Sequence, residues 1–146
     1  MNNQTNSSTE LLNFVAKNCE MGKSSINQLL PMIHEEEFRK TVEAQYREYA
    51  EIDSLADRAL AKRGSEAEHV GAMAKVSSYL MINAGALLDD SVQHMAEMMC
   101  KGSSNGIIEI TRHLSAHRDA EPEVQGLANR LLAAEERNVE ELKQFL

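Results

Sequence analysis

The residues of this chain with the most chemical potential are polar side chains at positions where a helical pattern calls for apolar ones. Gln45 stands in the middle of one apolar stripe, and Glu135 and Asn138 stand in the middle of another. Burying such groups costs free energy unless each finds a partner. Their placement predicts a hydrogen-bonded polar network or a metal site in the core, whereas a helix register shifted by one residue would turn them to solvent.

A carboxylate and an imidazole one helical turn apart form a second candidate. Asp90 and His94 have i, i+4 spacing, so a helix would present both to one metal ion, although such a pair is more often solvated. A further carboxylate, Glu20, lies beside Cys19 at mid-length of the first predicted helix. Together with the polar stripe positions, these residues bring metal chemistry into consideration.

His113 and His117 have the same i, i+4 spacing on a short predicted helix, with Glu109 one turn earlier. Two imidazoles at this spacing can bind zinc, and Asp119 would be the third ligand. The HEXXH pattern of zinc hydrolases is absent, because Leu114 follows His113. A solvated helix face is the interpretation we prefer.

A run of sulfur-containing residues offers no clearer chemistry. Met95, Met98, Met99 and Cys100 could form a soft-metal site, but flexible methionines that fill core gaps are the better interpretation. The chain has no nucleophile elbow, Walker A or GxGxxG pattern, so no conventional cofactor enzyme is indicated. Whether the chain is an enzyme stays open.

Five helical segments would position these residues, each with apolar residues at 3.6-residue spacing. They run from Ser8 or Thr9 to Pro31, from about Glu35 to Gly64, from Ser65 to about Lys101, from Ile107 to about His117, and from Ala120 or Glu121 onward. Residues 102–106 (GSSNG) are predicted to form a loop, and residues 1–8 a disordered tail. We therefore expect one all-α domain over residues 9–146, an antiparallel up-down four-helix bundle with an additional short helix before the last long helix.

Composition limits the partners of this domain. The net charge is −8, and no Lys/Arg stripe offsets it, so a nucleic acid partner is not expected. No apolar run approaches the ~20 residues of a membrane span, and the polar start is unlike a signal peptide. Cys19 and Cys100 are far apart in the sequence, which favours free thiols. The sequence predicts a cytoplasmic protein without a membrane partner.

The helix pattern and the polar placement resemble the ferritin-like superfamily, in its rubrerythrin-like bacterial branch, over most of residues 9–146. Di-iron bundles of this kind take one Glu from each of two helices and a Glu-x-x-His from each of the other two. Here the corresponding pairs are Gln45-x-x-Glu48 and Glu135-x-x-Asn138. Neither pair ends in His and one begins with Gln, a poor iron ligand, so the resemblance implies a degenerate di-iron site.

The same resemblance implies a set of ligands for iron or manganese. Glu20 and Asp90 would take the single-carboxylate positions, and His94 would be the nearby nitrogen donor. The full implied set is Glu20, Glu48, Asp90, His94 and Glu135. The connection at Ser65 is short, whereas the ferritin branch proper uses a long crossover, and this favours simple up-down connectivity.

Two functions follow, from different classes. The first is a ferritin-like protein that binds metal through buried carboxylates, concerned with iron or with peroxide and oxygen in a bacterium. The alternative is a non-catalytic helical bundle that acts in oligomerisation or partner binding and keeps a relic polar core. Bundles of this kind often form homodimers, so a homo-oligomer is also a hypothesis.

Overall fold

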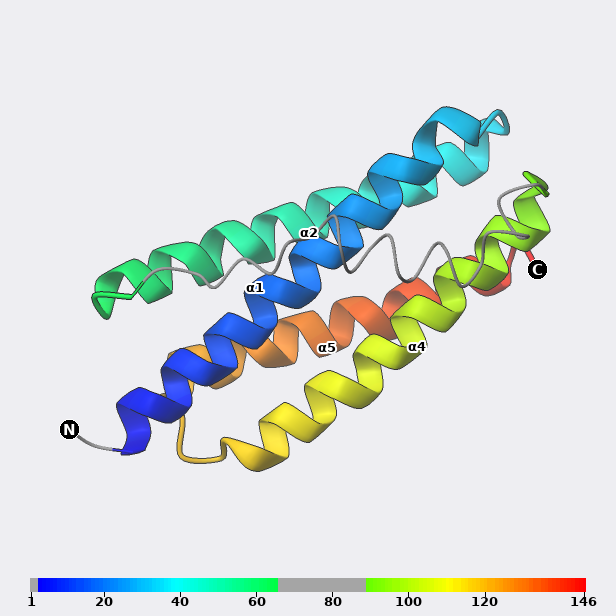
Figure 1. Ribbon diagram of the computed structural model, residues 1–146. Coiled ribbons are helices and arrows are strands. Elements are labelled where there is room, and N and C mark those ends of the chain that lie inside the picture. Colours follow the sequence, from blue (N-terminus) through cyan, green and yellow to red (C-terminus); the bar gives the residue numbers. More distant parts are fainter. Residues whose placement is uncertain (1–2, 66–88) are drawn as a thin grey trace.

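Four α-helices make up most of the described chain in the computed structural model, which describes residues 3–65 and 89–146. They are α1 (Asn3–Leu29), α2 (Glu36–Lys62), α4 (Val92–Ala116) and α5 (Pro122–Lys143), and the 3-10 turn η1 (Leu30–Met32) follows α1 (Figure 1). These ranges contain no strand, so the predicted all-α class is confirmed for them. Most of the third predicted helix, residues 66–88, lies outside the described ranges.

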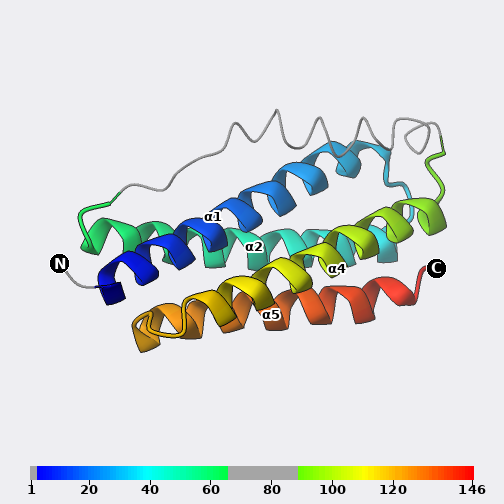
Figure 2. The same cartoon turned by 60° about the horizontal axis from the view of Figure 1, so that its bottom comes forward.

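The helices pack in two pairs, α1 with α2 and α4 with α5, and the pairs meet mainly through contacts of α5 with α2 and α1. In each pair the second helix runs back along the first (Figures 1 and 2). Helices α2 and α4 run in the same direction, so α2 ends at the opposite end of the molecule from the start of α4. The residues that connect α2 to α4, 66–88, lie outside the described ranges, so the up-down alternation predicted through the short connection at Ser65 stays a prediction.

The first helix begins earlier than predicted. Residues 3–8, which the sequence pattern assigned to a tail, belong to α1. Ser8 is fully buried, and its Oγ accepts a hydrogen bond of 2.9 Å from the N–H of Glu121, the residue that precedes α5. Ser8 thus satisfies the start of another helix instead of capping its own, and this contact ties the first turns of α1 to the chain between α4 and α5.

Helix α4 differs most from the sequence-based expectation. It begins after Ser91, whose Oγ accepts from the His94 N–H, and it continues through residues 102–106 to Ala116. The predicted GSSNG loop and the separate short helix from Ile107 are therefore wrong. Ser103 and Gly106 are buried within α4, where they face the other helices, and this tertiary packing outweighs the weak helix propensity of Gly, Ser and Asn.

The remaining boundaries and the helix register agree with the sequence pattern. Pro31 lies in η1 after α1, and Pro122 stands in the first turn of α5. Gly64 follows α2 with a φ of +70°, a conformation that suits glycine. The predicted stripe of α2 is buried along its whole length: Phe38, Val42, Gln45, Tyr49, Ile52, Ala56 and Leu60. Within residues 3–65 and 89–146, no helix has both the length and the apolar character that crossing a membrane requires.

The contact between Ser8 and Glu121 gives a first test. Ser8→Ala removes the acceptor of a partly buried N–H, so the free energy of unfolding should fall by about 1–2 kcal/mol in denaturant titrations. Ser7→Ala is the matched control, because the Ser7 hydroxyl donates to Asp119 at an exposed site, and it should change stability by about 0.5 kcal/mol or less. Equal losses in the two variants would contradict the role given to Ser8.

Candidate functional site

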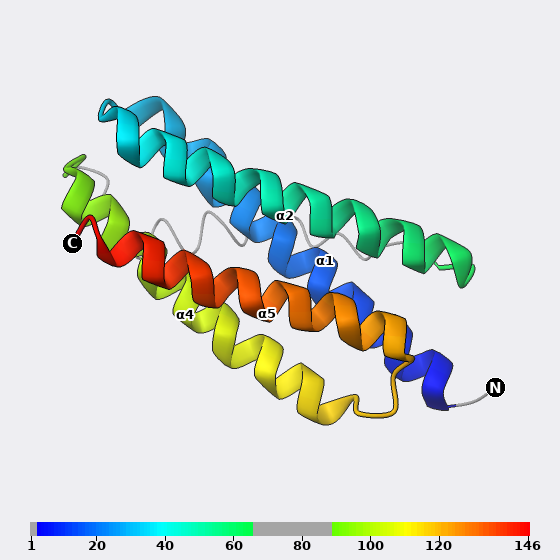
Figure 3. The same cartoon turned by 180° about the vertical axis from the view of Figure 1, so that it is seen from behind.

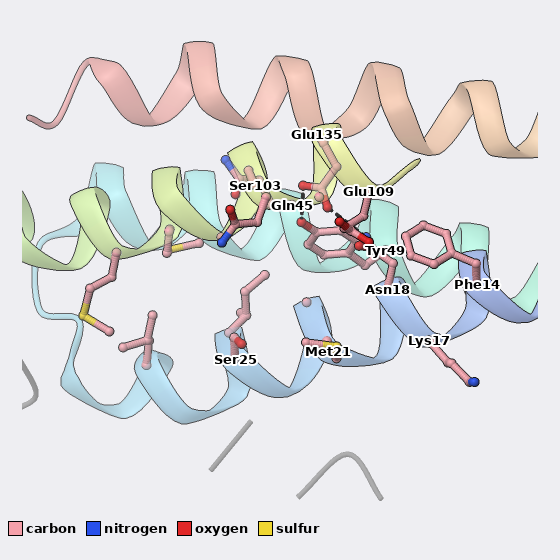
Figure 4. Close-up of a pocket in the computed structure, with 18 residues that line it drawn as sticks. Phe14, Lys17, Asn18, Met21, Ser25, Gln45, Tyr49, Ser103, Glu109 and Glu135 are labelled. Atoms are coloured by element: carbon pink, nitrogen blue, oxygen red, sulfur yellow. Dashed lines mark hydrogen bonds between the residues drawn. The ribbon is translucent and has the colours of Figure 1, made fainter. Parts of the chain in front are cut away.

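A cavity of about 320 Å³ lies among all four helices. Its apolar lining comes from Phe14, Met21, Ile26, Leu29, Met98 and Met99, and its polar lining includes Asn18, Ser25, Gln45, Tyr49, Ser103, Asn105, Glu109 and Glu135. Figure 4 shows Glu135 descending from α5 toward Tyr49 and Asn18 at one part of this cavity. The cavity therefore combines a methionine-rich apolar wall with a compact polar group.

The centre of the polar group is the Glu135 carboxyl, which is only 2% exposed. Its Oε1 accepts a 2.6 Å hydrogen bond from the Tyr49 hydroxyl of α2, and its Oε2 accepts a 2.9 Å bond from the Asn18 amide of α1. Asn138 Nδ2 donates to the Tyr49 oxygen at 3.3 Å, and Ser103 of α4 also hydrogen-bonds the carboxyl. One side chain is thus held by groups from all four helices.

Two glycines give these side chains their space. A Cβ atom on Gly106 would lie 2.6 Å from Glu135 Oε2, and a Cβ on Gly22 would lie 2.6 Å from a ring carbon of Tyr49. Both distances are shorter than atoms tolerate, and hydrogen bonds restrain both target side chains. Glycine at these two helix-interior positions is therefore needed for the carboxyl and the ring to lie where they do.

Burial changes the acid–base behaviour of the group. Burial raises the pKa of Glu135 above its ordinary value of 4.5, against the opposing effect of hydrogen bonds from Tyr49, Asn18, Ser103 and Asn138. Burial, with the nearby Glu135 charge, raises the pKa of Tyr49 well above 10.0, so Tyr49 remains a phenol and a hydrogen-bond donor at neutral pH. Burial also raises the pKa of the Cys19 thiol well above 9.0.

The predicted polar residues of the core are all buried, but they do not form one group. Asn138 reaches Glu135 through Tyr49, whereas the Gln45 amide donates to Glu141 Oε1 at 3.2 Å. Gln45 therefore pairs with Glu141, which lies nearly two turns after Glu135 on α5. The helix register was correct, but the direction of the Gln45 side chain was not visible in the pattern.

The residues implied as metal ligands are not brought together. Glu48 forms two 2.9 Å hydrogen bonds with Arg130 and lies 3.8 Å from Arg137, which lowers the Glu48 pKa. Asp90 is exposed ahead of α4, His94 Nδ1 lies 3.9 Å from Asp89, and Glu20 is half-buried on α1. Among the described residues, no three His, Cys, Asp or Glu side chains are grouped so as to hold a metal ion.

The donor set therefore does not fit a di-iron centre. The neighbours of Glu135 are a phenol, a hydroxyl and amides, and none of the other four candidate ligands joins it. Two guanidinium groups already neutralise the Glu48 carboxylate, which leaves it poorly suited to a cation. Iron or manganese binding stays a prediction from the resemblance, and this arrangement gives it no support.

His113 of α4 and His117, the residue that follows the helix, also lie differently from their predicted roles. His113 stacks on Phe14 with ring centroids 3.9 Å apart, and His117 follows with its ring 6.0 Å from that of His113. His117 Nε2 lies 3.5 Å from Glu10 Oε2, while Asp119 accepts from Ser7. The solvated-face interpretation is wrong, because the rings pack against α1, and the proposed zinc ligands do not converge.

Sequence reasoning missed the donors that hold Glu135. The spacing of Tyr49 predicts only a core position, and the pattern gives Asn18 and Ser103 no role. A glycine in a helix interior often marks a close approach of another group, so Gly22 and Gly106 were the available signal. No protein-family model, curated protein or solved structure matches this chain.

The close approach at Gly106 predicts a large effect of a small substitution. Gly106→Ala should lower the free energy of unfolding by about 1–3 kcal/mol, because the added methyl displaces the Glu135 carboxyl. Gly126→Ala is the control: this glycine of α5 is exposed with nothing within 4 Å, so alanine should stabilise by about 0.5–1 kcal/mol. In a Glu135→Ala background, the cost of Gly106→Ala should largely disappear. Equal effects at the two glycines would refute the packing model.

The raised pKa of Glu135 predicts how stability depends on pH. Between pH 4.5 and the native pKa, the folded state holds the Glu135 proton more tightly than the unfolded state does. The contribution of Glu135 to stability should therefore fall as the pH rises through this window. Urea titrations at several pH values should show that the stability of wild type relative to Glu135→Gln declines with rising pH.

Glu48→Gln serves as the control with the opposite sign. The Glu48 pKa is lowered, so its contribution is present above pH 4.5 and is lost as the pH falls through the native pKa. The stability of wild type relative to Glu48→Gln should therefore decline with falling pH. The same sign in both comparisons would show that Glu135 is not desolvated.

Proposed function

We propose that this chain is a non-catalytic helical binding protein that takes up a small amphipathic organic molecule in the cavity among α1, α2, α4 and α5. The observation that carries the proposal is the composition of the cavity wall. Apolar side chains dominate it, while a few polar groups gather around Glu135. Small-molecule sites in proteins typically have this composition, an apolar cavity with few convergent polar groups and at least one shifted pKa.

The methionines support this proposal. Met21, Met98 and Met99 come from α1 and α4, on two sides of the cavity. Methionine is unbranched and polarizable, so it adapts to ligands of different shape at little cost. Leucine or isoleucine at the same positions would make a stiffer wall.

The state of the potential nucleophiles favours binding over catalysis. The Cys19 thiol is buried and its raised pKa keeps it protonated, which makes it a poor nucleophile. The Tyr49 phenol is likewise neutral at physiological pH. Each of these groups can donate a hydrogen bond, and neither is activated for attack.

In this proposal the resemblance to the ferritin-like superfamily extends to the fold and does not extend to metal binding. Helices α1 and α5 run one way and α2 and α4 the other, and this arrangement supports a four-helix bundle of the ferritin-like kind. The di-iron function of such folds needs carboxylates and imidazoles that meet at one point. The described residues favour a bundle whose centre binds an organic ligand and not a metal ion.

Filling the cavity tests the proposal. N-phenylnaphthylamine, a neutral probe whose fluorescence rises in apolar sites, should bind wild type saturably at one molecule per chain. Met21→Trp places an indole in the cavity and should weaken this binding at least about tenfold. Ala133→Trp adds the same group at an exposed position of α5 and should leave binding unchanged.

The outcomes separate ligand binding from general hydrophobicity. Circular dichroism should show the same helix content in all three proteins. Equal weakening by both tryptophans, or no saturable binding to wild type, would refute the proposal. A saturable binding that only Met21→Trp removes would place the probe in the cavity.

A further inference from the structure

We infer that the cavity selects organic cations, amines on an apolar body whose ammonium group pairs with Glu135. This inference rests on the proposed function and adds the chemical class of the ligand. It starts from the partners of Glu135 in the described part of the chain, which are all neutral: Asn18, Tyr49, Ser103 and Asn138. The carboxyl receives hydrogen bonds, but no cation within residues 3–65 and 89–146 forms an ion pair with it.

Three cations of the described core helices are paired with carboxylates other than Glu135. Arg130 and Arg137 pair with Glu48, and Lys23 pairs with Asp53 at 2.7 Å. Lys17 lines the cavity, yet its side chain points away from Glu135 (Figure 4). A buried carboxylate without a counter-charge is unfavourable, so Glu135 either holds a proton or accepts a cation from outside.

Access to the cavity allows the second possibility. Glu135 is buried from bulk solvent and yet is part of the cavity wall, together with Ser25, Ser103 and Asn105. An ammonium group has three N–H donors, and the hydroxyl and amide oxygens of these residues are acceptors that lie around the same space. The Ser103 hydroxyl can rotate, so that it accepts from a ligand while it donates to Glu135.

The charges that face the site favour a cation and disfavour an anion. On α1 and α2, Cys19 and Tyr49 are both neutral at physiological pH because their pKa values are raised, and the Lys17 ammonium, which also lines the cavity, points away from Glu135. On α4, Glu109 adds a second carboxylate to the cavity lining, and Arg112 pairs with it at 3.0 Å, so Glu135 is the carboxylate there without a paired cation among the described residues. The chain as a whole carries a net charge of −8. A carboxylate ligand would place a second negative charge beside the desolvated Glu135 carboxylate. With no cation to compensate either charge, this is strongly unfavourable.

Three probes with the same chain and different head groups test the inference: octylamine, octanol and octanoate. At pH 7.5 the three are cationic, neutral and anionic, and each competes with N-phenylnaphthylamine for the cavity. Octylamine should bind at least about tenfold more tightly than octanol, as a charge-assisted hydrogen bond would confer, and octanoate should be the weakest.

Two isosteric variants locate the head group. Glu135→Gln removes the charge and should abolish the preference for octylamine over octanol, while octanol and the fluorescent probe still bind. Glu109→Gln removes one charge at the cavity lining, and it should change the preference by no more than about twofold, because Glu109 is half-exposed and screened. The retained binding of the fluorescent probe shows that each variant is folded.

The outcomes distinguish the inference about cations from the proposed ligand-binding function. Equal binding of the three octyl probes would overturn the cation inference and leave the ligand-binding function intact. An unchanged octylamine preference in Glu135→Gln, or a larger loss in Glu109→Gln, would likewise overturn the role of Glu135. If none of the probes, the fluorescent one included, binds wild type, the proposed function itself is refuted.

Discussion

The burial of the Glu135 carboxyl, with neutral hydrogen-bond donors around it, constrains the rest of this structure. A carboxyl group that is only 2% exposed must have its oxygens satisfied by the protein. The donors come from α1, α2 and α4, so one side chain of α5 fixes the relative depth of all four helices. Gly22 and Gly106 are part of the same arrangement, because the missing side chain of Gly22 leaves room for the Tyr49 ring and that of Gly106 leaves room for the Glu135 carboxyl.

The charged pairs of the molecule contribute less to this arrangement than the buried group does. Half of the described salt bridges join two exposed side chains, and most of these pairs are about one turn apart on one helix, as with Lys101 and Glu97. Such pairs contribute about 0.2–1 kcal/mol each. A buried group that loses its partner costs about 1–3 kcal/mol, so the contacts of Glu135 and of Ser8 with Glu121 outweigh the surface pairs. The relative positions of α1 and α5, which Figure 3 shows from behind, thus depend on a few buried polar contacts and on the apolar core.

The amphipathic pattern of the sequence was sufficient to predict the helices and the side of each that is buried, including the unusual positions of Gln45, Glu135 and Asn138. It failed where tertiary contacts oppose local preference. Gly and Ser in residues 102–106 suggest a loop, yet the packing of Glu135 against Gly106 keeps them helical. The i, i+3 spacing of Glu135 and Asn138 could not show that a phenol from another helix lies between them. The spacing of residues along one helix predicts which face of that helix is buried. A functional site also depends on which residues the neighbouring helices place opposite that face.

The same comparison explains why a metal-binding pattern and a ligand-binding cavity are easily confused in sequence. Both require polar residues at core positions of a helical bundle, and both tolerate the cost of burying them. They differ in what surrounds the central carboxylate. A metal site needs several anionic or imidazole donors within one coordination sphere, whereas Glu135 is surrounded by donors of hydrogen bonds that would compete with a metal ion for its oxygens. The methionines that line the same cavity complete an environment suited to an organic molecule, because they supply dispersion contacts without fixed shape. The chemistry of this core is therefore determined less by its carboxylate than by the neutral donors and thioethers that the other three helices place around it.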